Sequence, residues 1–171
     1  MLSVGRVSRR ITIATFFGIL IFLSKIFLPT PLDKILIFPQ AVLLTLSYLI
    51  IGFPGATYTG LIGGLLTAIW RAPLAIFTIV FALIYGLLID TLCQLMHAKF
   101  NGEVHKKRLV IAITVSTAII GLLSYYVTVY IFRLLPRNLM LEIGILIAGT
   151  INGLVAGYVA ILIWNRIKKL M

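Results

Sequence analysis

Charged residues, and acidic residues above all, are scarce in this chain. Only 11% of its 171 residues are charged, and four are aspartate or glutamate. Apolar residues make up 61%, and the mean hydropathy is +1.16. A water-soluble globule needs more polar surface than this composition supplies. The composition therefore excludes most soluble proteins and predicts a membrane protein with one domain, residues 1–171.

The motifs of soluble catalysts are missing as well. We find no nucleotide-binding motif, no zinc-ligand spacing and no nucleophile paired with a base, so neither an enzyme, a cofactor nor a metal site is expected. The single cysteine, Cys93, allows no internal disulfide and is expected to be a small core residue. The longest polar stretch, 97–108, has the length of a loop, in which His97 and His105 are expected to face water.

Six hydrophobic stretches fill nearly all of the chain. They predict helices over residues 11–28, 35–53, 56–70, 74–96, 109–132 and 139–164. About 20 residues of helix cross a hydrocarbon core of about 30 Å, and only the third stretch is short for this. Pro39 lies inside the second stretch and is expected to kink it or to leave a carbonyl group free. The predicted fold is all-α, with six transmembrane helices in one compact bundle.

The basic residues predict the orientation of these helices. Six crossings place ten of the fifteen Lys and Arg residues on one side, namely Arg6, Arg9, Arg10, Lys99, Lys106, Lys107, Arg108, Arg166, Lys168 and Lys169. Because basic loops stay in the cytoplasm, both termini are expected there, in a multi-pass protein of the cell membrane. A re-entrant third stretch would put the basic C-terminus opposite the basic N-terminus. The net charge of +11 is thus explained by the orientation of the helices and not by binding to nucleic acid. The first apolar run is interpreted as a retained signal anchor.

Small residues at intervals of four predict close helix packing. The stripes are Ala14 and Gly18 in the first stretch, Gly60 and Gly64 in the third, and Gly149, Gly153 and Gly157 in the sixth. Membrane helices associate through close contact at such residues. We expect packing faces here, although the spacing leaves open whether the partner helix belongs to this chain or to another protein.

Polar side chains inside the apolar runs are the candidates for function. Asn152 lies ten residues beyond Glu142, about 15 Å at helical rise, and hence near the membrane midplane. Helix–helix hydrogen bonding and ligand contact explain Asn152 equally well. Glu142 is expected to face inward, either to pair with Arg133 or Arg137 or to bind a ligand. Asp90 has no embedded acidic neighbour for an ion relay, so contact with another subunit or hydration is expected.

The fifth stretch carries hydroxyl groups at helical intervals, at Thr114, Thr117, Ser124 and Thr128. They share one side, which is expected to face the bundle and to bond carbonyl groups of the same helix. Three tyrosines follow at its outer end. For Tyr126 and Tyr130, an interfacial aromatic belt is a sufficient explanation.

The chain resembles the substrate-binding S components of energy-coupling-factor (ECF) transporters, a vitamin-uptake family. The likeness covers the whole length: six spans in under 200 residues, cytoplasmic termini and a basic N-terminus. The glycine-rich passage Leu49–Leu66 is similar to the family's second-to-third helix region, and the sixth helix with its central Asn152 also fits.

This resemblance implies a subunit that captures a vitamin-like molecule outside the cell and is energised by a transmembrane coupling subunit and two ATPase subunits. It implies a docking pair on the first helix, here Ala14 and Gly18, with glycine in place of the family's second alanine. It also implies an outward-facing pocket formed by Tyr85, Ser124, Tyr125, Glu142 and Asn152, with Thr30, Trp70 and Arg71 near its mouth. No vitamin-specific signature matches, so the substrate stays open.

Two other functions stay open on the residues alone. One is an autonomous small secondary transporter or channel, for which Asp90 is the only supporting residue. The other is a membrane assembly protein whose glycine stripes bind partner helices and which takes no small ligand.

Overall fold

Six α-helices and one short β-hairpin make up the computed structural model over the residues that it describes, which are 2–27, 37–100, 103–131, 133 and 138–170. The helices are α1 (Leu2–Ile26), α3 (Phe38–Ile51), α4 (Gly55–Trp70), α5 (Ala75–Leu95), α6 (Lys106–Tyr130) and α7 (Leu139–Leu170), with a 3-10 turn, η1 (Ala72–Leu74), between α4 and α5. Strand β1 (Lys99–Phe100) pairs antiparallel with β2 (Glu103–Val104) within the stretch predicted as a loop. The prediction of a helical bundle is confirmed.

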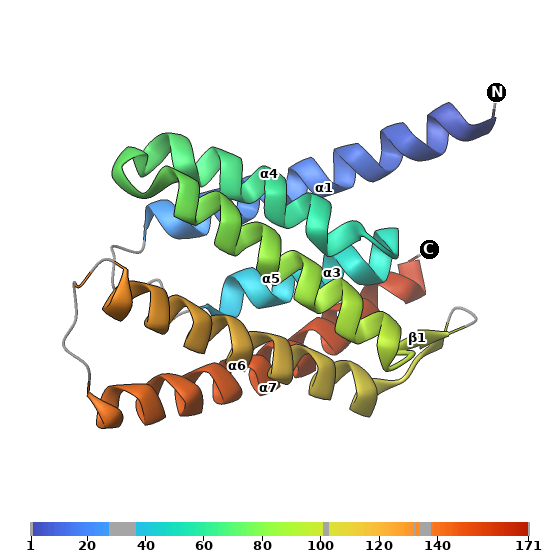
Figure 1. Ribbon diagram of the computed structural model, residues 1–171. Helices are drawn as coiled ribbons and strands as arrows, with labels where there is room; N and C mark the ends of the chain where they lie inside the picture. Colours follow the sequence, from blue (N-terminus) through green and yellow to red (C-terminus); the bar gives the residue numbers. More distant parts are fainter. Residues whose placement is uncertain (1, 28–36, 101–102, 132, 134–137, 171) are drawn as a thin grey trace.

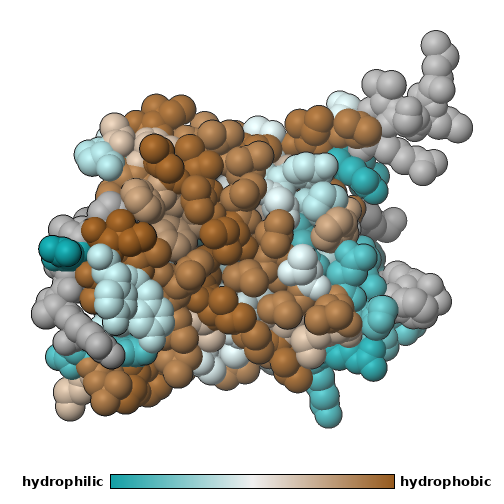
Figure 2. Space-filling model, viewed as in Figure 1, coloured by the Kyte–Doolittle hydropathy of each residue, from teal (hydrophilic) through white to brown (hydrophobic). Residues whose placement is uncertain are grey.

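The helices lie side by side in alternating directions, and both chain ends lie at the same end of the bundle (Figure 1). Four described segments are long and apolar enough to cross a membrane: Val7–Ile26, Ala72–Leu95, Lys106–Tyr130 and Leu139–Lys169. Helix α3 is apolar but shorter. On the face shown in Figure 2, apolar residues cover the middle and polar residues gather at the two ends. This distribution is typical of a membrane protein.

The helix boundaries agree with the predictions best in the middle of the chain. Helices α4 and α5 match the predicted 56–70 and 74–96 to within one residue. By contrast, α1 begins at Leu2 and not at residue 11, and α7 continues to Leu170, beyond the predicted 164. Neither extension contains proline, and arginine and lysine are good helix formers, so the helices continue past their apolar parts.

Pro39 does not kink the second helix, contrary to the prediction. Helix α3 begins at Phe38, so Pro39 lies in its first turn, where a missing backbone N–H costs no helical hydrogen bond. The helix then ends at Gly52, whose φ of +82° is a left-handed conformation that favours glycine. The predicted start at residue 35 lies outside the described residues.

Helix α3 lies at the centre of the bundle and contacts the other five α-helices. Ten of its 14 residues are buried. A helix that is apolar all round needs neighbours on every side, and α3 has them. The remaining helices form two antiparallel pairs, α4 with α5 and α6 with α7, and α1 packs against α4.

The glycine stripes form the contacts within these pairs. A Cβ atom on Gly60 would lie 2.5 Å from the carbonyl oxygen of Ala82 in α5, and one on Gly153 would lie 2.6 Å from the Cα atom of Thr114 in α6. Gly149 and Gly157 approach the α6 backbone in the same way. The prediction of packing faces is confirmed, and the partner of each of these stripes is a helix of the same chain.

Two side chains hold the turn between α3 and α4. Asp90 of α5 accepts hydrogen bonds from the backbone N–H groups of Ala56 (3.1 Å) and Thr57 (2.7 Å) and from the Thr57 hydroxyl (2.6 Å). Lys99 of β1 donates to the carbonyl of Leu49 at 2.6 Å, near the end of α3. A carboxylate at a helix N-terminus and an ammonium group at a C-terminus both complement the helix dipole.

These contacts correct the interpretation of Asp90. Its side chain is fully buried, and its partners lie in α4, so the expected contact with another subunit or with water is wrong. Lys99 also lies 5.3 Å from the ring centroid of Trp164. Burial lowers the pKa of Lys99, whereas the Leu49 carbonyl and the Trp164 ring favour its charged form. Cys93 is buried, as predicted, and His97 and His105 are exposed.

Candidate functional site

A cluster of tyrosines and one glutamate joins the end of α6 to the beginning of α7. We call it the tyrosine–glutamate cluster; it comprises Tyr125, Tyr126, Tyr130, Asn138 and Glu142. The hydroxyl of Tyr126 donates a hydrogen bond to Oε1 of Glu142. The rings of Tyr126 and Tyr130 stack with centroids 6.0 Å apart, and those of Tyr125 and Tyr126 lie 5.7 Å apart.

Asn138 fixes the geometry of this cluster. The hydroxyl of Tyr125 donates to the Asn138 carbonyl at 3.2 Å and accepts from the Asn138 N–H at 3.3 Å. The side-chain oxygen of Asn138 accepts from the N–H of Met140 at 2.9 Å, which is a helix-capping bond at the start of α7. Because both helices are tied to Asn138, Glu142 in the first turns of α7 is held beside Tyr126.

Part of the cluster is open to a ligand. Tyr125 is buried, but Tyr126 is 38% exposed, Tyr130 is 56% exposed and Glu142 is half-buried. Stacked aromatic rings beside a carboxylate suit a flat molecule that carries a positive charge or hydrogen-bond donors. Among the described residues, no three His, Cys, Asp or Glu side chains are grouped as a metal ion would require.

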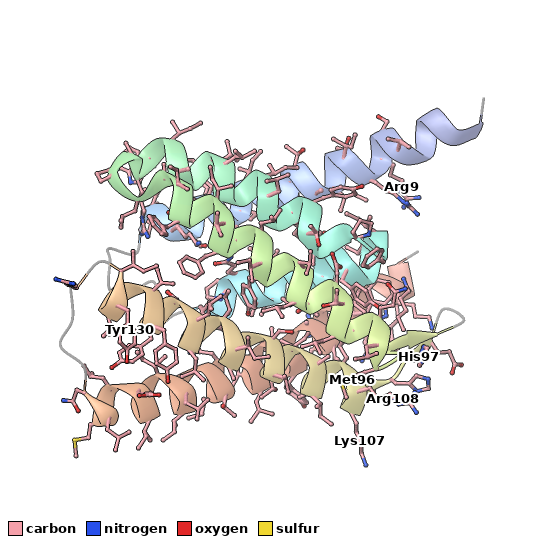
Figure 3. The ribbon with its side chains drawn as sticks, in the orientation of Figure 1. Arg9, Met96, His97, Lys107, Arg108 and Tyr130 are labelled. Carbon is pink, nitrogen blue, oxygen red and sulfur yellow. The ribbon has the colours of Figure 1, made fainter. Side chains whose placement is uncertain are left out.

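The cluster and most of the basic residues lie at opposite ends of the bundle. Figure 3 shows Tyr130 at one end and Arg9, Lys107 and Arg108 at the other. We call the second end the basic end. It is formed by the start of α1, the β-hairpin, the start of α6 and the end of α7 (Figure 1), and its described basic residues are Arg9, Arg10, Lys99, Lys106, Lys107, Arg108, Arg166, Lys168 and Lys169.

Two of the residues predicted for the pocket, Tyr125 and Glu142, belong to this cluster. Glu142 hydrogen bonds to Tyr126. Of the two arginines predicted to pair with it, Arg133 is exposed, and Arg137 lies outside the described residues. Ser124, in the same part of α6, is half-buried, and its carbonyl accepts the hydroxyl of Thr128.

Of two other predicted pocket residues, Tyr85 lies in a helix–helix interface and Asn152 lies on α7. Tyr85 is almost fully buried, and its hydroxyl lies 2.8 Å from that of Thr117, which links α5 to α6. Asn152 is half-buried on α7, between the packing residues Gly149 and Gly153.

Two of the residues predicted near the mouth of the pocket, Trp70 and Arg71, lie at the end of α4. Trp70 is exposed at the last position of α4. The guanidinium group of Arg71 donates to the carbonyl of Lys25 at 3.1 Å and so joins the end of α4 to the end of α1. Thr30 lies outside the described residues.

Three of the predicted hydroxyl groups of α6 donate hydrogen bonds within their own helix. Thr114 donates to the carbonyl of Val110, Thr117 to that of Ile113 and Thr128 to that of Ser124, all within the same helix. This pattern was predicted. These bonds satisfy the hydroxyl donors within α6, and the Thr117 hydroxyl also contacts that of Tyr85 in α5.

The predicted docking residues, Ala14 and Gly18, lie between α1 and α4. Ala14 is fully buried, and a Cβ atom on Gly18 would lie 2.9 Å from Ile62 Cγ2 and 3.1 Å from the backbone nitrogen of Gly63. Small residues on both helices bring the two backbones together, so this face of α1 is covered by the chain itself.

Sequence reasoning missed Tyr126 and Tyr130 as site residues. Their spacing of four places them on one face of α6, and that spacing is the available signal. Tyrosines of a membrane-interface belt would occupy the same positions in the sequence, so the pairing with Glu142 becomes visible only in the fold.

Comparison with protein-family models, with curated proteins and with solved structures finds no match to this chain.

Proposed function

We propose that this chain is the membrane-embedded capture subunit of an ECF-type uptake transporter. In this proposal the six helices cross the cell membrane with both termini in the cytoplasm. The tyrosine–glutamate cluster faces outward and binds a vitamin or related small molecule. A separate coupling subunit and two ATPase subunits drive its release inside, and the chain itself is no catalyst.

The observation that carries this proposal is the separation of the two ends. Exposed aromatic rings and a carboxylate lie at one end, and nine of the twelve basic residues with described side chains lie at the other, whereas Lys25, Arg71 and Arg133 lie at the cluster end (Figure 3). Basic residues are retained on the cytoplasmic side of membranes, which leaves the cluster on the outer side. A receptor for uptake requires this arrangement.

The number of crossings is supported by the contacts of the short helices. Helix α4 has 16 residues, about 24 Å at helical rise. It begins beside Asp90, near the cytoplasmic end of α5, and ends where Arg71 meets the end of α1. It therefore runs from one end of the bundle to the other. Helix α3, of 14 residues, is surrounded by other helices and needs no contact with lipid across the full core.

The residues that favoured the two competing functions have partners within this chain. Asp90, the residue that favours an ion-coupled transporter, already has three hydrogen-bond donors in α4. The glycines that favour an assembly protein contact helices of this chain. Both alternatives would need other residues.

Docking to a coupling subunit needs a surface other than Ala14 and Gly18, because α4 covers them. The opposite face of α1 is apolar and exposed, with Phe16, Ile19 and Leu23 at helical spacing. We assign the coupling contact to this face. It is accessible without any separation of α1 from α4.

Ligand binding by the purified chain tests the proposal. The chain in neutral detergent, without ATP, is titrated with a panel of vitamins and their precursors that includes cationic heterocycles. We expect one compound to bind with submicromolar affinity, and Glu142→Gln and Tyr126→Phe each to weaken it by at least tenfold.

The matched controls are Glu103→Gln in β2 and Tyr158→Phe on the exposed side of α7. These make the same chemical changes away from the cluster and are expected to leave the affinity within twofold. Absence of binding across the panel, or equal losses in the controls, would contradict the proposal.

A further inference from the structure

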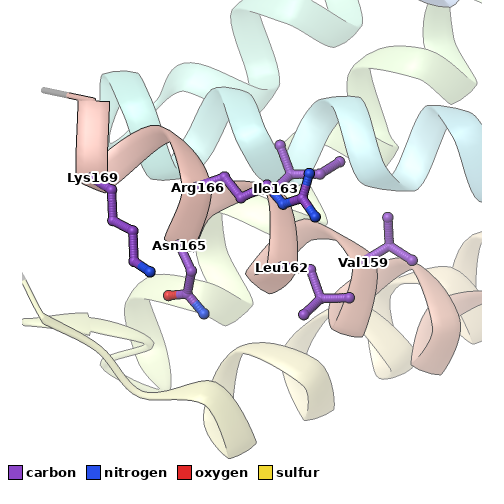
Figure 4. A pocket seen from close by; sticks show the side chains of 6 residues that line it. All are labelled: Val159, Leu162, Ile163, Asn165, Arg166 and Lys169. Atoms are coloured by element: carbon purple, nitrogen blue, oxygen red, sulfur yellow. The ribbon is translucent and has the colours of Figure 1, made fainter.

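A pocket of about 430 Å³ lies at the basic end of the bundle, on the last turns of α7. Its lining residues are Val159, Leu162, Ile163, Asn165, Arg166 and Lys169 (Figure 4). The tyrosine–glutamate cluster is at the other end of this 32-residue helix, so the pocket is a separate site.

The lining changes from apolar to cationic along the helix. Val159, Leu162 and Ile163 lie toward the middle of the bundle, and Arg166 and Lys169 lie toward the chain end (Figure 4). Ten residues separate Val159 from Lys169, about 15 Å at helical rise. This distance is about half of a hydrocarbon core of about 30 Å. The pocket therefore covers the depth of one leaflet, up to its headgroups.

The charge of the pocket selects an anion. Arg166 and Lys169 are both exposed, and none of the described lining residues is acidic. Seven further basic residues surround this end of the bundle, against one exposed acidic residue, Glu103, among the residues described there. An anionic headgroup meets attraction from all of them.

The apolar half selects a molecule that also has a hydrocarbon chain. Leu162 is 48% exposed on the outer side of α7, next to the exposed residues Val155 and Tyr158. In a membrane these side chains face lipid tails. A free phosphate, a nucleotide or an acidic peptide has nothing to place against this surface.

We propose that this pocket binds an anionic phospholipid, with the phosphate at Arg166 and Lys169 and the first part of one acyl chain along Leu162 and Val159. Asn165 adds an amide that hydrogen bonds to the headgroup. The lipid holds the end of α7 at the depth of the headgroups. This inference requires that α7 spans the membrane, but it does not depend on the proposed uptake function.

Lipid binding to the full chain in neutral detergent tests the proposal. Dioctanoyl phosphatidylglycerol and dioctanoyl phosphatidylcholine are titrated separately, and bound lipid is counted by native mass spectrometry. We expect phosphatidylglycerol to bind at least tenfold more tightly. The double variant Arg166→Gln/Lys169→Gln should lose about 25-fold, since each basic residue contributes about fivefold.

The matched control is Lys106→Gln/Lys107→Gln, which removes the same charge from the same end but outside the pocket. It should change the affinity by less than about threefold. The variant Leu162→Gln alters only the apolar half and should weaken phosphatidylglycerol severalfold. All of these side chains are exposed, and circular dichroism verifies that the variants keep their helices.

Three results would overturn the proposal. Equal losses in the two double variants would mean diffuse attraction to the basic end. Glycerol phosphate binding as tightly as phosphatidylglycerol would mean a site for soluble phosphate. Binding of a poly-glutamate peptide without preference between the two lipids would assign the pocket to an acidic protein segment. Binding of a vitamin to the tyrosine–glutamate cluster, at the other end of the bundle, affects none of these outcomes.

Discussion

Asp90 and Thr57 are 33 positions apart in sequence, yet one carboxylate oxygen of Asp90 accepts both the backbone N–H and the hydroxyl of Thr57. The other oxygen accepts the N–H of Ala56. A side chain of α5 thus supplies the acceptors that the first turn of α4 lacks. In a membrane such backbone groups find no water, so this contact is structural.

Replacement of Asp90 should destabilise the bundle. Asp90→Ala leaves two buried N–H groups without acceptors and should lower the free energy of unfolding by about 3 kcal/mol. Asp90→Asn keeps one acceptor oxygen and should cost about 1 kcal/mol. Thermal unfolding in detergent, followed by circular dichroism, measures both. Loss of transport in a variant of unchanged stability would instead indicate a role in ion coupling.

Two glycines of α7 should respond in opposite ways to the same substitution. Gly153→Ala places a Cβ atom 2.6 Å from the backbone of α6 and should cost about 2 kcal/mol through overpacking. Gly144→Ala meets nothing within 4 Å and should be neutral or stabilising by up to about 1 kcal/mol. Equal unfolding midpoints for the two variants would contradict the α6–α7 packing described above.

Substitutions on the two faces of α1 should separate stability from assembly. Gly18→Leu drives a side chain into Ile62 and Gly63 and should destabilise the chain by about 2 kcal/mol or more. Phe16→Ala on the exposed face should leave stability within about 0.5 kcal/mol and weaken co-purification with the coupling subunit severalfold. If Phe16→Ala leaves co-purification unchanged, the coupling contact lies elsewhere.

Cysteine labelling of intact cells tests the orientation. In a Cys93→Ser background, cysteine at Met140, which is exposed at the start of α7, should react with a membrane-impermeant thiol reagent. Cysteine at Lys107 or Lys169 should react only after the cells are opened. Reaction of all three positions in intact cells would show that the basic end is not cytoplasmic.

The sequence predicts the helices and their packing faces because both depend on local periodicity. Gly149, Gly153 and Gly157 repeat every four residues, and that repeat alone indicates a face for close contact. The helix ends are less predictable. Pro39 follows an apolar run that begins earlier in the chain, so nothing local shows that it occupies the first turn of α3.

The long-range partners leave no such pattern. Two of the three donors to Asp90 and the acceptor of Lys99 are backbone groups, which every residue has, so the sequence alone does not single out these partners. For the candidate site, Tyr125 and Glu142 could be selected as polar residues near one membrane surface. Their connection through Asn138 and Tyr126 depends on how α6 and α7 are paired.

The contacts at the α3–α4 turn have a consequence for biosynthesis. The acceptor for the N–H of Ala56 is synthesised 34 residues later, and the donor for the carbonyl of Leu49 is synthesised 50 residues later. When the ribosome has finished α4, this hairpin still exposes backbone groups that lipid does not solvate. If the six helices cross a membrane, we therefore expect this hairpin to enter the bilayer together with α5 and β1, which supply those partners.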